Sequence, residues 1–124
     1  MKRSTRFLLM TVSLLVLILA GWMAFAQDAA KVAPTHFKVL LDNDRVRVLE
    51  YRAKKGEKIA LHSHPANVVY ALENGHTRFT SPDGKVKDLD FKAGEAVWSD
   101  GGPHTQETIT DTHVIQIELK PAKK

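Results

Sequence analysis

The sequence predicts an all-β domain, a sandwich or a barrel, behind an N-terminal leader. After Gln27, short stretches rich in Val, Ile, Leu, Tyr and Thr alternate with turn signals about every ten residues. No stretch of this part of the sequence combines helical apolar spacing with capping residues. Because unpaired strand edges favour aggregation, we expect the strands to close into a barrel or to pair in a homodimer.

The composition indicates a single domain and excludes cysteine chemistry. The chain has 124 residues, which suit one domain, and no cysteine. The missing cysteines exclude disulfides, thiolate metal sites and a cysteine nucleophile. The net charge of +4 arises largely in the leader, where Lys2, Arg3 and Arg6 lie without an acid. The rest of the chain is close to neutral, so we expect no nucleic-acid partner.

Residues 1–26 have the order of a secretory signal peptide. A basic start precedes an apolar stretch from Phe7 to about Gly21, and Ala24-Phe25-Ala26 follows with small residues at the cleavage positions. We therefore predict cleavage after Ala26 and an exported protein, periplasmic or secreted, without membrane contact beyond the leader. The alternative is an uncleaved anchor, since the 20 residues 7–26 could cross a bilayer. Both interpretations place the remaining chain outside the cytoplasm.

The first half of the domain is predicted to hold four strands. Residues 27–35 are small and polar and are expected to form a flexible lead-in to a domain over residues 36–120. An Asp-Asn-Asp cluster ends the first strand, Lys-Lys-Gly ends the second, a His-Ser-His-Pro segment follows the third, and Asn74-Gly75 closes the fourth as a hairpin. The predicted strands are residues 37–41, 45–53, 57–61 and 67–73.

The second half continues the pattern. Ser81-Pro82-Asp83-Gly84 suits a type I turn between two strands, and a glycine-rich loop precedes His104 at the start of another strand. In the last strand, His113 alternates with apolar residues on one face, which predicts a core histidine hydrogen-bonded to backbone. The predicted strands with both ends defined are residues 76–80, 85–91, 95–99 and 112–119.

The histidines indicate a candidate metal site. His62 and His64 are separated by one residue in an extended segment, so their side chains point to the same side. His104 could bring a third imidazole from a neighbouring strand, and Gln106 should share its side. Neutral imidazole is a good ligand for zinc, copper, nickel and iron. Three such ligands would leave positions open for water or a substrate.

The same residues resemble the two motifs of the cupin superfamily. Gly56, five further residues, His62-Ser63-His64 and a glycine eleven residues later resemble the first motif. Gly94 followed by the 100–104 segment, Asp-Gly-Gly-Pro-His, resembles the second. The resemblance covers roughly residues 37–119 and implies a jelly-roll β-barrel with a metal or ligand site inside. The resemblance implies that His62, His64 and His104 are ligands of one divalent ion, which would be Fe, Mn, Zn, Ni or Cu.

Three positions depart from the family pattern. Val68 stands where the first motif has its glutamate ligand, Asp100 replaces a proline, and Thr108 replaces an asparagine. The resemblance implies that Val68 and Tyr70 face inward. We expect the pocket to be lined by Val68, Tyr70, Trp98 and Gln106, with plain core packing as the alternative for the two aromatic residues. Three neutral ligands would leave the full charge on the ion, which favours anionic ligands.

We expect a small exported cupin-domain protein that binds one divalent metal through three histidines. The resemblance implies metal-dependent, dioxygenase-like chemistry on a small molecule, although a fold does not determine a reaction. One alternative is a non-catalytic module that binds a metal or a small ligand. The other is a metal-free structural jelly roll that acts through dimerisation. The sequence leaves open whether the protein is an enzyme.

Overall fold

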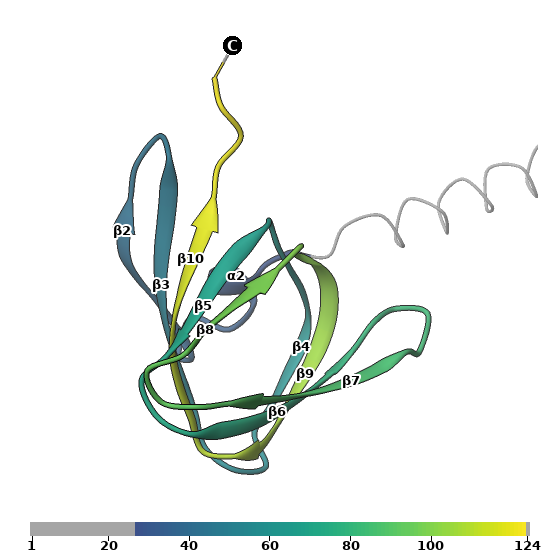
Figure 1. Cartoon of the computed structure of the whole chain (residues 1–124). Coiled ribbons are helices and arrows are strands. Elements are labelled where there is room, and N and C mark those ends of the chain that lie inside the picture. The colour runs from purple at the N-terminus through teal and green to yellow at the C-terminus, as the bar shows by residue number, and fades with distance from the viewer. Residues whose placement is uncertain (1–26, 124) are drawn as a thin grey trace, which may run out of the picture.

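The computed structural model describes residues 27–123, which form two facing five-stranded β-sheets (Figure 1). The predicted signal peptide, residues 1–26, lies outside the described residues. Within residues 27–123, no helix has the length and apolar character needed to cross a bilayer. The elements are β1 (Gln27–Asp28), α2 (Ala29–Val32), β2 (Phe37–Asp42), β3 (Val46–Ala53), β4 (Lys58–His64), β5 (Asn67–Ala71), β6 (Gly75–Thr80), β7 (Val86–Phe91), β8 (Ala96–Ser99), β9 (Gly102–Thr110) and β10 (Thr112–Leu119).

The strand order is that of a jelly roll, as predicted. One sheet has the order β1-β4-β9-β6-β7 and the other has the order β2-β3-β10-β5-β8. Strands that are distant in the sequence therefore pair, as β4 does with β9 and β3 does with β10, both antiparallel. The predicted strands occur with small shifts at their ends. The third extends through both histidines to His64, and the strand that carries His104 begins at Gly102.

The interior between the sheets is partly apolar and partly polar. The apolar part is a cluster built around Phe37, Leu49 and Tyr51. Polar side chains share the interior, and burying them requires that they be hydrogen-bonded or bind something else. The buried polar residues are His62, His64, Asn67, Thr77, Gln106, Thr108, Thr112, Gln116 and Glu118. A polar interior in so small a barrel indicates a binding site rather than a core alone.

Residues 27–35 differ from the flexible lead-in expected from their sequence. β1 pairs in parallel with β4, and Gln27 lies opposite His62. The short helix α2 packs beside β2 and β4, and Ala29 is completely buried. The small side chains that suggested flexibility are the ones that allow this close packing. The segment is thus part of the folded domain.

Candidate metal centre

Three histidines from two neighbouring strands converge inside the barrel. His62 and His64 lie two residues apart on β4, and the antiparallel register places His104 of β9 directly opposite His62. The three imidazoles offer ligand nitrogens that lie within 4.8 Å of one another. His62 and His64 are buried, with 0% and 5% exposure. The structure therefore brings together the three residues that the sequence suggested as ligands.

Gly101 fixes the loop that delivers His104. Its φ of +81° is a backbone conformation that residues with a side chain rarely adopt. A Cβ at this position would lie 2.5 Å from the backbone oxygen of His64 and from the carbonyl carbon of Pro65. The loop before β9 consequently packs directly against the end of β4. This close approach brings the start of β9 alongside the end of the histidine strand.

Hydrogen bonds set the tautomers of two of the histidines. His62 Nδ1 donates to the backbone oxygen of Ala60 over 2.8 Å, and His64 Nδ1 donates to Glu118 Oε1 over 2.7 Å. A carbonyl and a carboxylate can only accept, so in the neutral form of each imidazole the proton lies on Nδ1 and Nε2 keeps its lone pair. Among the described residues, neither His62 Nε2 nor His104 Nε2 has a hydrogen-bond partner, although both atoms are buried.

The pKa values of two histidines favour the neutral form. Burial lowers the pKa of His62, and the positive charge of a protonated His64 would lower it further, against the opposing effect of the hydrogen bond that its Nδ1 donates to Ala60. Burial lowers the pKa of His104 to about 3, with additional repulsion from His62 and His64. Both imidazoles are thus uncharged at neutral pH. Buried, neutral imidazoles with free nitrogens at one point fit a divalent metal ion.

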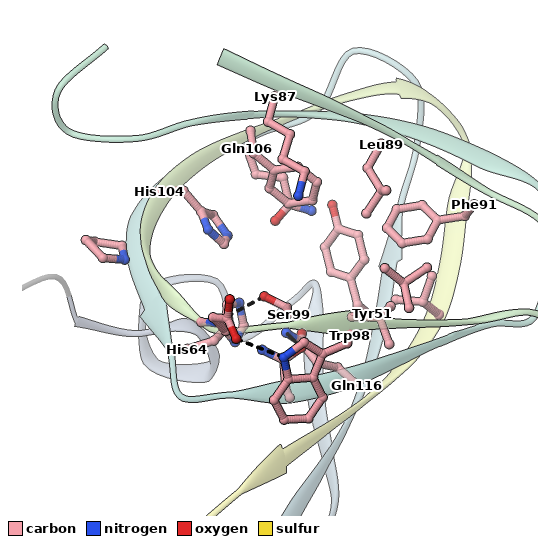
Figure 2. Close-up of a pocket in the computed structure, with 18 of the residues that line it drawn as sticks. Tyr51, His64, Lys87, Leu89, Phe91, Trp98, Ser99, His104, Gln106 and Gln116 are labelled. Carbon is pink, nitrogen blue, oxygen red and sulfur yellow. Dashed lines mark hydrogen bonds between the residues drawn. The ribbon is translucent and has the colours of Figure 1, made fainter. Parts of the chain in front are cut away.

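A cavity of about 330 Å³ adjoins the histidines (Figure 2). His64 and His104 form one wall, while Leu89 and Phe91 lie on the opposite side, with Tyr51 between them. The polar lining includes Lys87, Gln106, Gln116, Asn67 and Ser99. An apolar wall with a few convergent polar groups is typical of a small-molecule site.

Two of the four residues expected to line the pocket do so. Gln106 is buried at the cavity, and Trp98, 55% exposed, lies at its edge rather than in the core. The inward placement predicted for Val68 and Tyr70 is wrong by one position. On β5 the cavity is lined instead by Asn67 and Val69, and Tyr70 is 40% exposed. A shift of one residue along a strand reverses which side chains face the interior.

The last strand presents an inward face that its apolar pattern did not predict. Its inward residues include Gln116 and Glu118, with Glu118 only 2% exposed. Besides holding His64, Glu118 Oε2 accepts a hydrogen bond of 2.7 Å from Arg47 Nε. His113 lies on the opposite face, and its Nε2 contacts Glu50 at 2.9 Å rather than backbone in the core. The one available signal for Glu118 was its alternation with Val114 and Gln116 along the strand.

No protein-family model and no curated protein matches the sequence. Solved structures do resemble the fold. A cupin domain from Bordetella pertussis Tohama I has a TM-score of 0.61 and 26% identity, covering 68% of this chain and 92% of that one. A cupin superfamily protein from Desulfitobacterium hafniense has a TM-score of 0.53 and 17% identity, covering 68% and 76%. A double-stranded β-helix protein from Klebsiella pneumoniae has a TM-score of 0.51 and 20% identity, covering 71% and 84%.

The fold and the site together define a class of protein. The strand order is that of a jelly roll, and three histidines from its two motif-bearing strands meet inside it. The solved structures that resemble it include cupin domains. The chain has the cupin fold, and its similarity to a solved cupin domain supports its assignment to the cupin superfamily.

Proposed function

We propose that the protein binds one divalent metal ion through His62, His64 and His104 and presents it to a small organic molecule in the adjoining cavity. One observation carries this proposal. The Nε2 atoms of His62 and His104 are buried without partners among the described residues, beside a third imidazole whose Nδ1 is already engaged. Leaving a buried polar atom unsatisfied costs about 1–3 kcal/mol, and an ion bound by both atoms removes that cost.

The ligand set favours a borderline or soft-leaning metal. Imidazole suits zinc, copper, nickel and iron, whereas manganese prefers ligand sets with carboxylate oxygens. A proton is a poor substitute for the metal, because the pKa of His104 lies at about 3. When bound, the ion would supply Lewis acidity or, as iron(II), a site for oxygen chemistry of the dioxygenase type.

The direct test is metal content. Protein purified without a histidine tag is loaded with zinc, dialysed and subjected to elemental analysis. We expect about one ion per chain in the wild type and almost none in His62→Ala, because removal of one of three ligands leaves too few donors. His36→Ala serves as the control, since His36 lies outside the cluster. A wild type that retains no zinc, nickel, copper or iron would refute the proposed site.

The second test distinguishes a metal ion with open coordination positions from one that the protein coordinates fully. Three protein ligands leave coordination positions open, which is the mark of catalytic rather than structural zinc sites. In cobalt-substituted protein, added azide should therefore change the visible spectrum. An unchanged spectrum would favour the alternative function, a non-catalytic metal-binding module.

The lining of the cavity holds one ammonium group, Lys87, and one carboxylate, Asp100, which already accepts a hydrogen bond from Trp98 Nε1. The ammonium group suggests an anionic ligand. Lys87 reaches over the cavity beside Gln106 (Figure 2), and in residues 27–123 no salt bridge engages its ammonium group. Leu89 and Phe91 offer an apolar surface for the body of the molecule. The function that the site supports best is thus metal-assisted binding or conversion of a small molecule with an apolar body and an anionic group.

This ligand class can be tested with a matched pair of small molecules. Benzoate and benzamide have nearly the same shape but differ in charge. We expect NMR titration of the zinc-loaded protein to show tighter binding of benzoate. Lys87→Met keeps the length of the side chain and removes its charge, so the preference for benzoate should shrink in that variant. Equal binding of both molecules to the wild type would contradict an anionic ligand.

We also propose that the protein acts outside the cytoplasm. The support is the basic, apolar and small-residue order of residues 1–26. The intact mass of the exported protein should correspond to a chain that begins at Gln27. A full-length, membrane-bound species would favour the uncleaved anchor instead.

A further inference from the structure

We propose that Glu118, Arg47 and Asp28 position His64 for metal binding, and that the N-terminal segment 27–33 belongs to the site because it carries the outer end of this chain of charges. The inference rests on the proposed metal-binding function and deepens it. In this arrangement the three residues do not touch the ion. They act through His64.

The first contact determines which nitrogen of His64 is free. Glu118 Oε1 accepts from His64 Nδ1 over 2.7 Å, in surroundings where the two side chains are 2% and 3% exposed. The carboxylate therefore holds the proton on Nδ1 and leaves the Nε2 lone pair of His64 available to a metal ion. The hydrogen bond to a carboxylate also makes the imidazole a stronger electron donor. His62 has only a backbone carbonyl in the corresponding place.

The second contact makes the buried carboxylate tolerable. An unpaired carboxylate at this depth would be strongly unfavourable. Arg47 lies directly opposite Glu118 in the pairing of β3 with β10. Its Nε and one terminal nitrogen each approach Glu118 Oε2 at 2.7 Å. Because Oε2 is taken by Arg47, Oε1 is left for His64, so Arg47 also decides how the carboxylate is oriented.

The third contact ties the chain to the N-terminal segment. Asp28 of β1 accepts a hydrogen bond from Nη2 of Arg47, the same terminal nitrogen that approaches Glu118. Burial opposes ionisation of Asp28, but the hydrogen bond and charge of Arg47 prevail and hold the pKa of Asp28 below its usual value. Asp28 in turn raises the pKa of Arg47. The guanidinium is thus held between two carboxylates and cannot turn away from Glu118 without losing one of them.

The backbone of the same segment supports the histidine strand. Gln27 lies opposite His62 and Asp28 opposite Ser63, in the parallel pairing of β1 with β4. The complete burial of Ala29 anchors the segment immediately after this pairing. The segment therefore reaches the metal centre twice, once through the main chain of β4 and once through the Asp28–Arg47–Glu118 chain of charges.

The test measures the tautomer of His64 in metal-free protein and the affinity for cobalt(II). Long-range ¹H–¹⁵N NMR should show a protonated Nδ1 and a bare Nε2 on His64 in the wild type. In Glu118→Gln the amide can offer an N–H to Nδ1, so we expect the other tautomer to become populated. Cobalt affinity should fall by roughly 10- to 100-fold, as is usual when an outer partner of a metal ligand is lost.

Two further variants keep the test decisive. Asp28→Ala perturbs the half-buried end of the chain, so it remains informative if Glu118→Gln fails to fold. We expect its cobalt affinity to fall several-fold. Asp88→Asn is the control, because it removes the salt bridge of an exposed pair with Arg78 on another hairpin. It should leave both the tautomer and the affinity unchanged.

The outcomes distinguish this proposal from the metal site itself. An unchanged tautomer together with unchanged cobalt affinity in Glu118→Gln would overturn the positioning role, even if the wild type binds metal. Affinity of Asp28→Ala equal to that of Asp88→Asn would remove the N-terminal segment from the site. A wild type that binds no cobalt would refute the proposed function, and the tautomer measurement would still decide whether Glu118 sets the protonation of His64.

Discussion

The six histidines divide evenly between the barrel interior and its outer surface, and the two sets have different partners. Every outer histidine lies against a carboxylate. The pairs are His36 with Glu57 at 3.2 Å, His76 with Asp90 at 2.5 Å and His113 with Glu50 at 2.9 Å. Of the inner three, only His64 contacts an acid, Glu118. Two inner Nε2 atoms have no partner in the described part of the chain.

This difference shows that residue type alone does not identify a ligand. The outer histidines are satisfied by nearby acids, and ion pairs at a protein surface contribute little to stability. The inner histidines are buried or half-buried, and their ligand nitrogens lie within 4.8 Å of one another. The inner histidines therefore form an arrangement that is unfavourable without a cation and favourable with one.

The largest expected effect is the response of stability to metal. A ligand at a thousand times its Kd stabilises a folded protein by about 4 kcal/mol. Zinc should raise the free energy of unfolding of the wild type and of His113→Ala by an amount of this order. His104→Ala should lose nearly the whole increment. Denaturant unfolding with and without zinc measures it, and equal increments in both variants would break the contrast between inside and outside.

The next effect concerns two loop glycines that have similar backbone conformations. Gly101 and Gly84 have φ values of +81° and +84°, but only Gly101 has backbone atoms where a Cβ would lie. We expect Gly84→Ala to cost about 1 kcal/mol of unfolding free energy through backbone strain alone. Gly101→Ala should cost roughly 3 kcal/mol, since the collision with His64 and Pro65 adds to the strain. Equal costs would mean that the loop can move away from β4.

Acid should destabilise the metal-free protein through its inner histidines. The folded pKa of His104 is about 3, below the ordinary 6.5, so the unfolded chain takes up a proton in this interval and the folded one does not. The contribution of neutral His104 to the free energy of unfolding is therefore fully present above pH 6.5. It is lost as the pH drops towards 3, by up to ~1.4 kcal/mol per pH unit. His104→Gln should show a flatter dependence of unfolding free energy on pH. Parallel curves for the two proteins would contradict the burial argument.

The smallest expected effect is at the surface. His36→Ala removes an exposed pair with Glu57, and such pairs are weak. The thermal unfolding midpoint and the zinc content should both equal those of the wild type within error. A clear loss of zinc would show that the outer set takes part in metal binding after all.

The sequence predicted the cluster of three histidines better than its surroundings. The spacing of His62 and His64 places both side chains on one face of a strand, whatever the rest of the fold does. The glycine-rich loop before His104 suggested a third imidazole from a neighbouring strand, and the resemblance to the cupin motifs supported that choice. The inward face of β5 was missed because a turn of only two residues, 65–66, precedes it. A difference of one residue in such a turn exchanges Val68 for Val69 at the cavity.

The supporting charges could not be read from the sequence. Arg47 and Glu118 are 71 residues apart and meet only through the pairing of β3 with β10. The pattern of β10 was also misleading, because its apolar face, with Ile115 and Ile117, points outward while Glu118 points in. The usual assignment of apolar residues to the interior fails where the interior is a polar site. The buried position of Ala29 likewise depends on tertiary packing that its composition does not reveal.

One measurement examines all six histidines at once. Long-range ¹H–¹⁵N NMR of the imidazole nitrogens is recorded before and after addition of one equivalent of zinc. The account predicts that the Nε2 signals of His62, His64 and His104 shift together and saturate at one equivalent. The signals of His36, His76 and His113 should remain in place. Shifts confined to the outer histidines, or no shift in any of the six, would contradict the claim that the three inner histidines form a metal site.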